Sequence, residues 1–157
     1  MNVVELLKAR NQTVATAESL TAGLLCATIV DTPGASAVVR GGLIVYATEL
    51  KHELAGVDQQ LLDEHGAVHP DVAVQLAEGA RKRCGSDWGI GLTGVAGPDP
   101  QDGVPPGTVH IGLSGPGVST VRTITLSGDR CAVRRDSVEK ALVLLSDYLL
   151  MTDAGNK

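Results

Sequence analysis

Segments of β-strand type alternate with segments of helical periodicity along most of this chain. Strand patterns cover residues 13–17, 38–47, 88–93, 108–114 and 119–127. Helical patterns cover residues 3–10, 21–30, 49–54, 59–64, 70–84 and 129–150. Such an alternation predicts an α/β fold in which helices pack on both faces of a central sheet.

The last two strand patterns are separated only by Gly115-Pro116-Gly117, which is typical of a hairpin between antiparallel strands. The sheet is therefore expected to be mixed and not purely parallel. We predict a single-domain three-layer α/β/α sandwich over residues 1–151, followed by a polar tail at residues 152–157.

The composition excludes several classes of function. The 157 residues carry a net charge of −5 and include one Trp, two Tyr and no Phe. Because nucleic-acid binding needs a basic face and often aromatic stacking platforms, we expect no direct nucleic-acid partner. No apolar run approaches the roughly 20 residues that cross a bilayer, and the N-terminus lacks the plan of a signal peptide. We expect a cytoplasmic protein without membrane contact.

Metal and disulfide chemistry are not indicated. The three cysteines form no CxxC pair, and the four histidines show no ligand spacing with one another. Asp99 and Asp102 lie in a Pro-rich loop and are the acidic groups that could hold a cation there. We predict no metal site and no cofactor.

The first candidate for chemistry is Ser19, in the stretch Thr-Ala-Glu-Ser-Leu-Thr-Ala-Gly. The pattern places it where a strand ends and a helix begins. Free N–H groups of the first helical turn, with the helix dipole, can stabilise a developing oxyanion there. A serine at this position can equally be a helix N-cap without catalytic function. Because the stretch does not match the G-x-S-x-G nucleophile elbow, both interpretations stay open.

The second candidate is the pair Tyr46 and Lys51, at the end of a strand and in the first turns of the next helix. A serine nucleophile needs a base, and a lysine can serve if burial lowers its pKa toward neutrality. Tyr46 could then relay or orient the proton. The alternative is a solvated helix lysine beside an ordinary strand aromatic.

Two further stretches suit ligand binding. Thr93 and Gly94 open a Gly-rich loop after a strand, where open α/β sheets usually hold ligands, although a plain tight turn would look the same. Asp129 suits a helix cap, and Arg130 follows it at the start of the last helix. A cation is unfavourable at a helix N-terminus unless it holds an anion such as phosphate.

Taken together and in order, these stretches resemble one family. They read TAESLTAG, RGGLIVYATELKHELAGV, EHGAVHPDVAVQLAEGA, LTGVAGPD, PPGTVHIGL and SGDRCAVR. Over residues 2–150 the chain resembles the CinA C-terminal domain, whose stand-alone members are nicotinamide mononucleotide deamidases. The resemblance implies a metal-independent hydrolase that converts nicotinamide mononucleotide to nicotinate mononucleotide and ammonia, in pyridine nucleotide and NAD recycling.

By position, the resemblance implies that Ser19 is the nucleophile and that Lys51 and Tyr46 form the base and proton relay. The residues expected to bind substrate are Thr93, Gly94, Arg130 and Thr21. It also implies a homodimer or a larger homo-oligomer. Glu18 matches the family, but no role follows for it.

Three positions depart from the family pattern: Ala22, Thr48 and His69. Ala22 is expected to narrow the space beside Ser19. Thr48 can still cap the helix that follows it, and His69 is tolerable because it precedes the helix begun by Pro70.

A second class of function is a non-catalytic binding or regulatory module linked to competence or DNA damage. Binding alone does not require a nucleophile and a base together. The joint presence of Ser19, Tyr46, Lys51 and Thr93 therefore argues against a binding module and favours an amidase.

Overall fold

Five strands, six α-helices and one short 3₁₀ helix lie within residues 2–154, the part of the chain that the computed structural model describes. In chain order the elements are α1 (Val3–Arg10), β1 (Val14–Glu18), α2 (Leu24–Val30), the 3₁₀ helix η1 (Ala35–Ala37), β2 (Val39–Ile44), α3 (Thr48–Ala55), α4 (Gln59–His65), α5 (Pro70–Cys84), β3 (Trp88–Gly94), β4 (Thr108–Gly115), β5 (Val118–Thr125) and α6 (Arg130–Ala154).

The strands form one sheet in the order β2-β1-β3-β4-β5. β1 runs parallel to β2 and β3, whereas β4 runs antiparallel to β3 and β5. Pro116 and Gly117 form the tight turn between β4 and β5, and Gly117 has a φ of 68°. The predicted mixed sheet and hairpin are confirmed. The carboxyl ends of the three parallel strands meet at one edge of the sheet.

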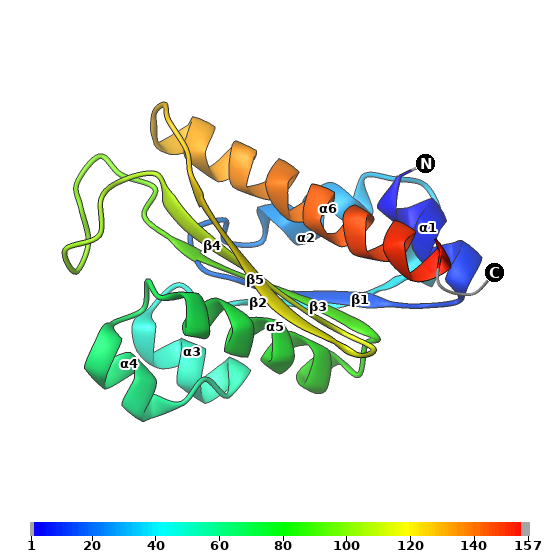
Figure 1. Ribbon diagram of the computed structural model, residues 1–157, viewed down its shortest axis with the longest axis horizontal. Helices are drawn as coiled ribbons and strands as arrows, with labels where there is room; N and C mark the ends of the chain where they lie inside the picture. The colour runs from blue at the N-terminus through cyan, green and yellow to red at the C-terminus, as the bar shows by residue number, and fades with distance from the viewer. Residues whose placement is uncertain (1, 155–157) are drawn as a thin grey trace.

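Helices cover both faces of the sheet and give three layers (Figure 1). On one face α1, α2 and α6 share a core that includes Leu7, Leu25 and Leu145. On the other face α3, α4 and α5 share a smaller core that includes Leu62 and Leu76. The predicted α/β/α sandwich is therefore confirmed.

Two glycines let α5 lie close against the sheet. Gly91 of β3 and Gly112 of β4 are paired across the two strands. A Cβ atom on either residue would clash with the backbone carbonyl of Ala73 in α5. Glycine is needed at these positions because the helix backbone approaches the strand backbone directly.

Two helix boundaries differ from those expected by more than one residue. α2 begins at Leu24 and not at residue 21, because Ala22 and Gly23 have φ values of 47° and 95°. Residues 19–23 therefore form an irregular connection, here named the β1–α2 loop. α6 continues to Ala154, into the predicted polar tail, and residues 155–157 lie outside the described residues.

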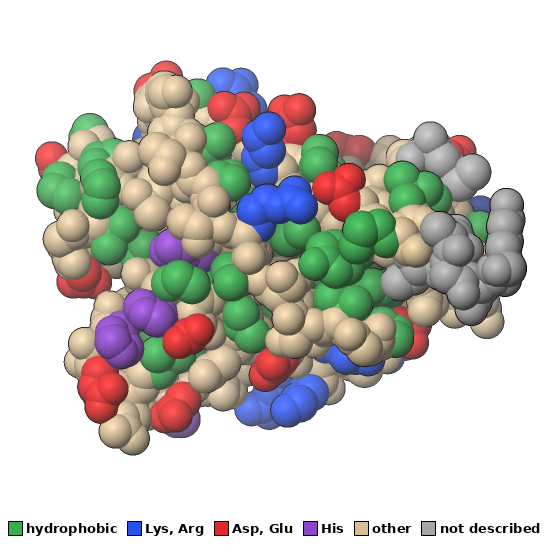
Figure 2. All heavy atoms as spheres, in the orientation of Figure 1, with side chains coloured by type: hydrophobic (Ala, Val, Ile, Leu, Met, Phe, Trp, Pro, Cys, Tyr) green, Lys and Arg blue, Asp and Glu red, His purple; other side chains and the backbone are tan. Residues whose placement is uncertain are grey.

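The surface view shows basic and acidic side chains dispersed over one face, with several histidine side chains close together on one side of it (Figure 2). The rings of His65 and His69, where α4 leads into α5, have centroids 4.5 Å apart. No helix within residues 2–154 combines the length and apolar character required to cross a membrane.

Candidate active site

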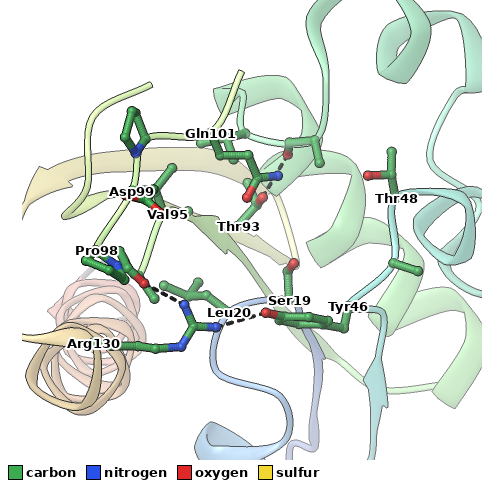
Figure 3. Close-up of a pocket in the computed structure, with 17 residues that line it drawn as sticks. Ser19, Leu20, Tyr46, Thr48, Thr93, Val95, Pro98, Asp99, Gln101 and Arg130 are labelled. Carbon is green, nitrogen blue, oxygen red and sulfur yellow. Dashed lines mark hydrogen bonds between the residues drawn. The ribbon is translucent and has the colours of Figure 1, made fainter. Parts of the chain in front are cut away.

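The ends of the three parallel strands bring three predicted site residues together. Ser19 follows β1 directly, Thr93 lies near the end of β3, and Tyr46 lies just beyond β2. A cavity of about 510 Å³ opens here, bordered also by residues 95–101 and by Arg130 of α6. Figure 3 shows the Ser19 side chain pointing into the space between Tyr46 and Thr93. This edge is where α/β sheets commonly bind ligands.

Ser19 presents its hydroxyl to the cavity. The residue is 8% exposed, and its backbone N–H donates to the Leu92 carbonyl oxygen at 3.0 Å. No protein group within residues 2–154 makes a hydrogen bond with the hydroxyl. The N-cap of α2 is Gly23, so the interpretation of Ser19 as a helix cap is wrong. The expectation that the first helical turn lies directly beside Ser19 is also wrong, because the β1–α2 loop intervenes.

The carboxylate of Glu18 binds the start of α2 instead. Its oxygens accept hydrogen bonds from Leu25 N at 2.8 Å, from Cys26 N at 3.0 Å and from Thr16 Oγ1 at 2.9 Å. Glu18 is fully buried, so these donors and the helix dipole must replace its hydration. Burial, followed by the charge of Glu18, raises the pKa of the Cys26 thiol. The role of Glu18 at the start of α2 was not predicted from the sequence, because α2 begins beyond an irregular loop.

Lys51 is buried, so its interpretation as a solvated helix lysine is wrong. The side chain is 1% exposed, and Nζ donates to the carbonyl oxygens of Val45 at 2.8 Å and Tyr46 at 3.1 Å. Burial lowers the pKa of Lys51 from 10.5 to about 8, against a smaller opposing effect of Glu49. An amine with this pKa can accept a proton near neutral pH. Lys51 does not line the cavity and makes no hydrogen bond to Ser19.

Val45 connects Lys51 to the backbone next to Ser19. Val45 N donates to the carbonyl oxygen of Glu18 at 2.9 Å, and the carbonyl of Val45 accepts from Lys51 Nζ. Val45 therefore links the Lys51 amine to the end of β1, the strand that Ser19 follows.

Arg130 joins three parts of the site. Its Nη2 donates to the Tyr46 hydroxyl at 2.9 Å, and its Nη1 donates to the Gly97 carbonyl oxygen at 2.6 Å (Figure 3). Tyr46 is 58% exposed and lines the cavity, and it lies beyond the end of β2, so its interpretation as a strand aromatic is wrong. Asp129 accepts a hydrogen bond from Ala132 N at 2.8 Å, as expected of a helix cap.

Thr93 and Gly94 line the cavity at the end of β3. The buried Thr93 hydroxyl donates to the Ala67 carbonyl oxygen at 2.7 Å and so ties β3 to the α4–α5 connection. A Cβ on Gly94 would lie 2.6 Å from the Thr108 carbonyl oxygen. Gly94 is therefore required by the packing of β3 against β4, whatever it does for a ligand.

Thr21 does not line the cavity. It is fully buried, and among the described residues its hydroxyl is a buried side-chain group without a hydrogen-bond partner. Its carbonyl oxygen accepts from Arg134 Nη2 at 3.3 Å. In this conformation a contact between the Thr21 side chain and a ligand would require the loop to move.

The charged side chains that line the cavity are Arg130 and Asp99. Asp99 lies in the exposed connection between β3 and β4. Within residues 2–154, no group of three or more His, Cys, Asp or Glu side chains is placed to hold a metal ion.

The three departures from the family pattern lie in different local settings. His69 is the N-cap of α5, and its Nδ1 accepts from Asp71 N at 3.1 Å. Thr48 was expected to cap α3, and this expectation is wrong. The N-cap is Ala47, and Thr48 is the first helical residue and lines the cavity. Ala22 adopts a left-handed φ and is not part of the cavity wall.

Comparison with known proteins gives one consistent result. The family model described as the CinA C-terminal domain matches residues 1–149. A CinA-like protein of Frankia casuarinae is 48% identical over 147 residues, which are 94% of this chain and 34% of the relative. A CinA-like protein of Gloeobacter violaceus is 43% identical over 152 residues, which are 95% of this chain and 36% of the relative. The chain thus spans about a third of the length of these curated relatives.

Solved structures agree with the sequence relatives. A competence-damaged protein (CinA) superfamily protein from Klebsiella pneumoniae superposes with a TM-score of 0.91 at 29% identity, covering 95% of this chain and 94% of that chain. The competence/damage inducible protein CihA from Agrobacterium tumefaciens gives a TM-score of 0.85 at 30% identity, covering 92% and 90%.

Proposed function

Since the chain belongs to the family of CinA C-terminal domains, we propose that it hydrolyses the carboxamide of nicotinamide mononucleotide to nicotinate mononucleotide and ammonia. Two features together carry the proposal. The Ser19 hydroxyl borders the cavity without a hydrogen-bond partner among the described residues, and the buried Lys51, in the helix that follows the neighbouring strand β2, has a lowered pKa. A binding function requires neither a serine nucleophile nor a base. It also gives no reason to keep a buried lysine, which destabilises the folded chain.

The reaction begins with attack of Ser19 Oγ on the carboxamide carbon. The proton of Ser19 passes to the neutral amine of Lys51, with the Tyr46 hydroxyl as relay, and then to the departing nitrogen, which leaves as ammonia. The intermediate is an ester on Ser19. Water hydrolyses this ester, which releases the carboxylate and restores the hydroxyl.

Substrate charge matches the cavity. Nicotinamide mononucleotide carries a cationic pyridinium ring and an anionic phosphate. Arg130 offers a guanidinium at the start of α6, where phosphate is favoured, and Asp99 offers a carboxylate to the ring. A cavity of about 510 Å³ lies within the usual range of small-molecule sites.

The test is ammonia release from nicotinamide mononucleotide with a chelator present, comparing wild type with Ser19→Ala. Wild type is expected to release ammonia and the variant to release none, with unchanged folding by circular dichroism. Equal release by both proteins would remove Ser19 from the mechanism. Tight binding of the mononucleotide without release by wild type would favour the non-catalytic module.

A further inference from the structure

The β1–α2 loop, residues 19–23, is the part of the site with the least regular backbone. It carries Ser19 and includes two left-handed residues, Ala22 and Gly23, before α2 begins. A loop of this kind keeps one conformation only if other groups hold it. The groups that hold the loop therefore also fix the position of Ser19.

One arginine outside the loop binds its backbone twice. Arg134 Nε donates to the Leu20 carbonyl oxygen at 2.9 Å, and Nη2 donates to the Thr21 carbonyl oxygen at 3.3 Å. Arg134 lies one turn after Arg130 on α6, which packs beside α2 on the same face of the sheet (Figure 1). Arg130 lines the cavity, whereas Arg134 does not. The two arginines thus have different contacts although they share one helix face.

These bonds fix the direction of two peptide groups. In a trans peptide the N–H points opposite to the C=O, so the N–H groups of Thr21 and Ala22 point away from Arg134. Ala22 N donates to the carbonyl oxygen of Ser19 at 3.1 Å. For Leu20 N and Thr21 N, no hydrogen bond is found among the described residues. Of these two residues only Leu20 lines the cavity, so Leu20 N is the unused backbone donor beside the nucleophile that a substrate can reach.

We propose that Arg134 is a positioning residue that holds Leu20 in the β1–α2 loop so that the Leu20 N–H receives the oxyanion formed when Ser19 attacks a carbonyl. The inference rests on the proposed amide hydrolysis. As Ser19 Oγ bonds to the carboxamide carbon, the carbonyl oxygen takes the electron pair of the C=O double bond. Donors placed in advance at that oxygen lower the barrier.

Glu18 holds the other end of the same loop. Its carboxylate binds Leu25 N and Cys26 N, beyond Gly23, and does not contact the peptides that Arg134 binds. Glu18 therefore fixes the exit into α2, while Arg134 fixes the segment directly after Ser19. The hydrogen bonds of the Arg134 side chain go only to this loop, so replacing it leaves the apolar contacts of α6 in place.

The test compares Arg134→Met and Arg134→Lys with the control Arg135→Met, which changes an exposed residue of the same helix turn. For Arg134→Met, kcat is expected to fall by about 100-fold, the loss typical of one missing oxyanion donor, with KM within about threefold. Arg134→Lys is expected to restore part of kcat, because an ammonium can bind one of the two carbonyls. Arg135→Met is expected to behave as wild type.

Two further measurements separate this inference from the proposed function. Hydrogen exchange of residues 19–26 is expected to accelerate in Arg134→Met and not in Arg135→Met. The rate at which a fluorophosphonate labels Ser19 is expected to fall as kcat does, and it needs no natural substrate. Labelling without ammonia release would refute the proposed substrate while still testing Arg134. Unchanged exchange, or wild-type labelling and kcat in Arg134→Met, would overturn the inference, and a wild type that is neither labelled nor active would overturn both.

Discussion

Replacing Lys51 with methionine is expected to abolish turnover and to stabilise the folded chain at neutral pH. Methionine fills a similar volume without a charge. Wild type keeps an ammonium group at a site that is 1% exposed, where two backbone carbonyls are its hydrogen-bond partners. If Lys51 were retained for stability alone, its replacement would not raise the free energy of unfolding.

The magnitude follows from the pKa of Lys51. A pKa of about 8 in the folded chain, against the ordinary 10.5, corresponds to about 3 kcal/mol of unfavourable free energy while the amine is charged. The lost hydrogen bonds to Val45 and Tyr46 offset roughly 1 kcal/mol each. At pH 7 the variant is therefore expected to be more stable than wild type by about 1 kcal/mol.

At alkaline pH wild type is expected to be more stable than Lys51→Met. Below pH 8 both folded and unfolded chains hold the proton, so the full penalty applies. Between pH 8 and 10.5 the folded chain releases the proton while the unfolded chain keeps it, and wild type gains stability with rising pH. By pH 10 this gain amounts to about 2–3 kcal/mol relative to the methionine variant.

Urea unfolding at pH 7 and pH 10 measures both quantities, with Lys140→Met on the exposed face of α6 as the control. The gap between Lys51→Met and wild type is expected to change sign, and the gap for the control is expected to stay constant. A gap for Lys51→Met that is the same at both pH values would refute the assignment of a lowered pKa to this lysine.

Three other predictions concern the reaction. For wild type, kcat/KM is expected to rise about tenfold per pH unit below pH 8 and to level off above it, because only the neutral Lys51 amine accepts a proton; a flat profile from pH 6 to 9 would exclude Lys51 as base. Arg130→Ala is expected to raise KM for the mononucleotide more than for the nucleoside, and equal increases would contradict a contact with phosphate. Asp99→Asn is expected to raise KM for the cationic mononucleotide about threefold, as suits an exposed ion pair, and to leave binding of the reduced, uncharged-ring analogue unchanged. If both ligands responded alike, Asp99 would not sense the ring charge.

Much of the fold followed from local patterns. α1 and α5 begin and end where the sequence predicts, and both have local start signals: Asn2 and Glu5 form a capping box, and Pro70 is the first residue of α5. The mixed sheet followed from the short connection between the last two strands. Periodicity and turn chemistry are properties of neighbouring residues, so they can be seen without the tertiary structure.

The parts that could not be predicted depend on contacts between distant segments. The helix at residue 21 was expected too early, since the left-handed φ of Ala22 is not a local preference of alanine. The burial of Lys51 depends on how α3 lies against the strand ends, and the contacts of Arg134 join α6 to a loop more than a hundred residues earlier. For Glu18, a carboxylate at a strand end was the available signal, and its use as a distant cap required the loop geometry.

Trapping the acyl group of Ser19 tests the central claim most directly. Hydroxylamine competes with water for an acyl-enzyme, so wild type incubated with nicotinamide mononucleotide and hydroxylamine is expected to form the hydroxamate of nicotinate mononucleotide together with ammonia. Ser19→Ala is expected to form neither product. Ammonia release by wild type with the carboxylate as sole product at every hydroxylamine concentration, or hydroxamate formation by Ser19→Ala, would contradict a covalent intermediate on Ser19.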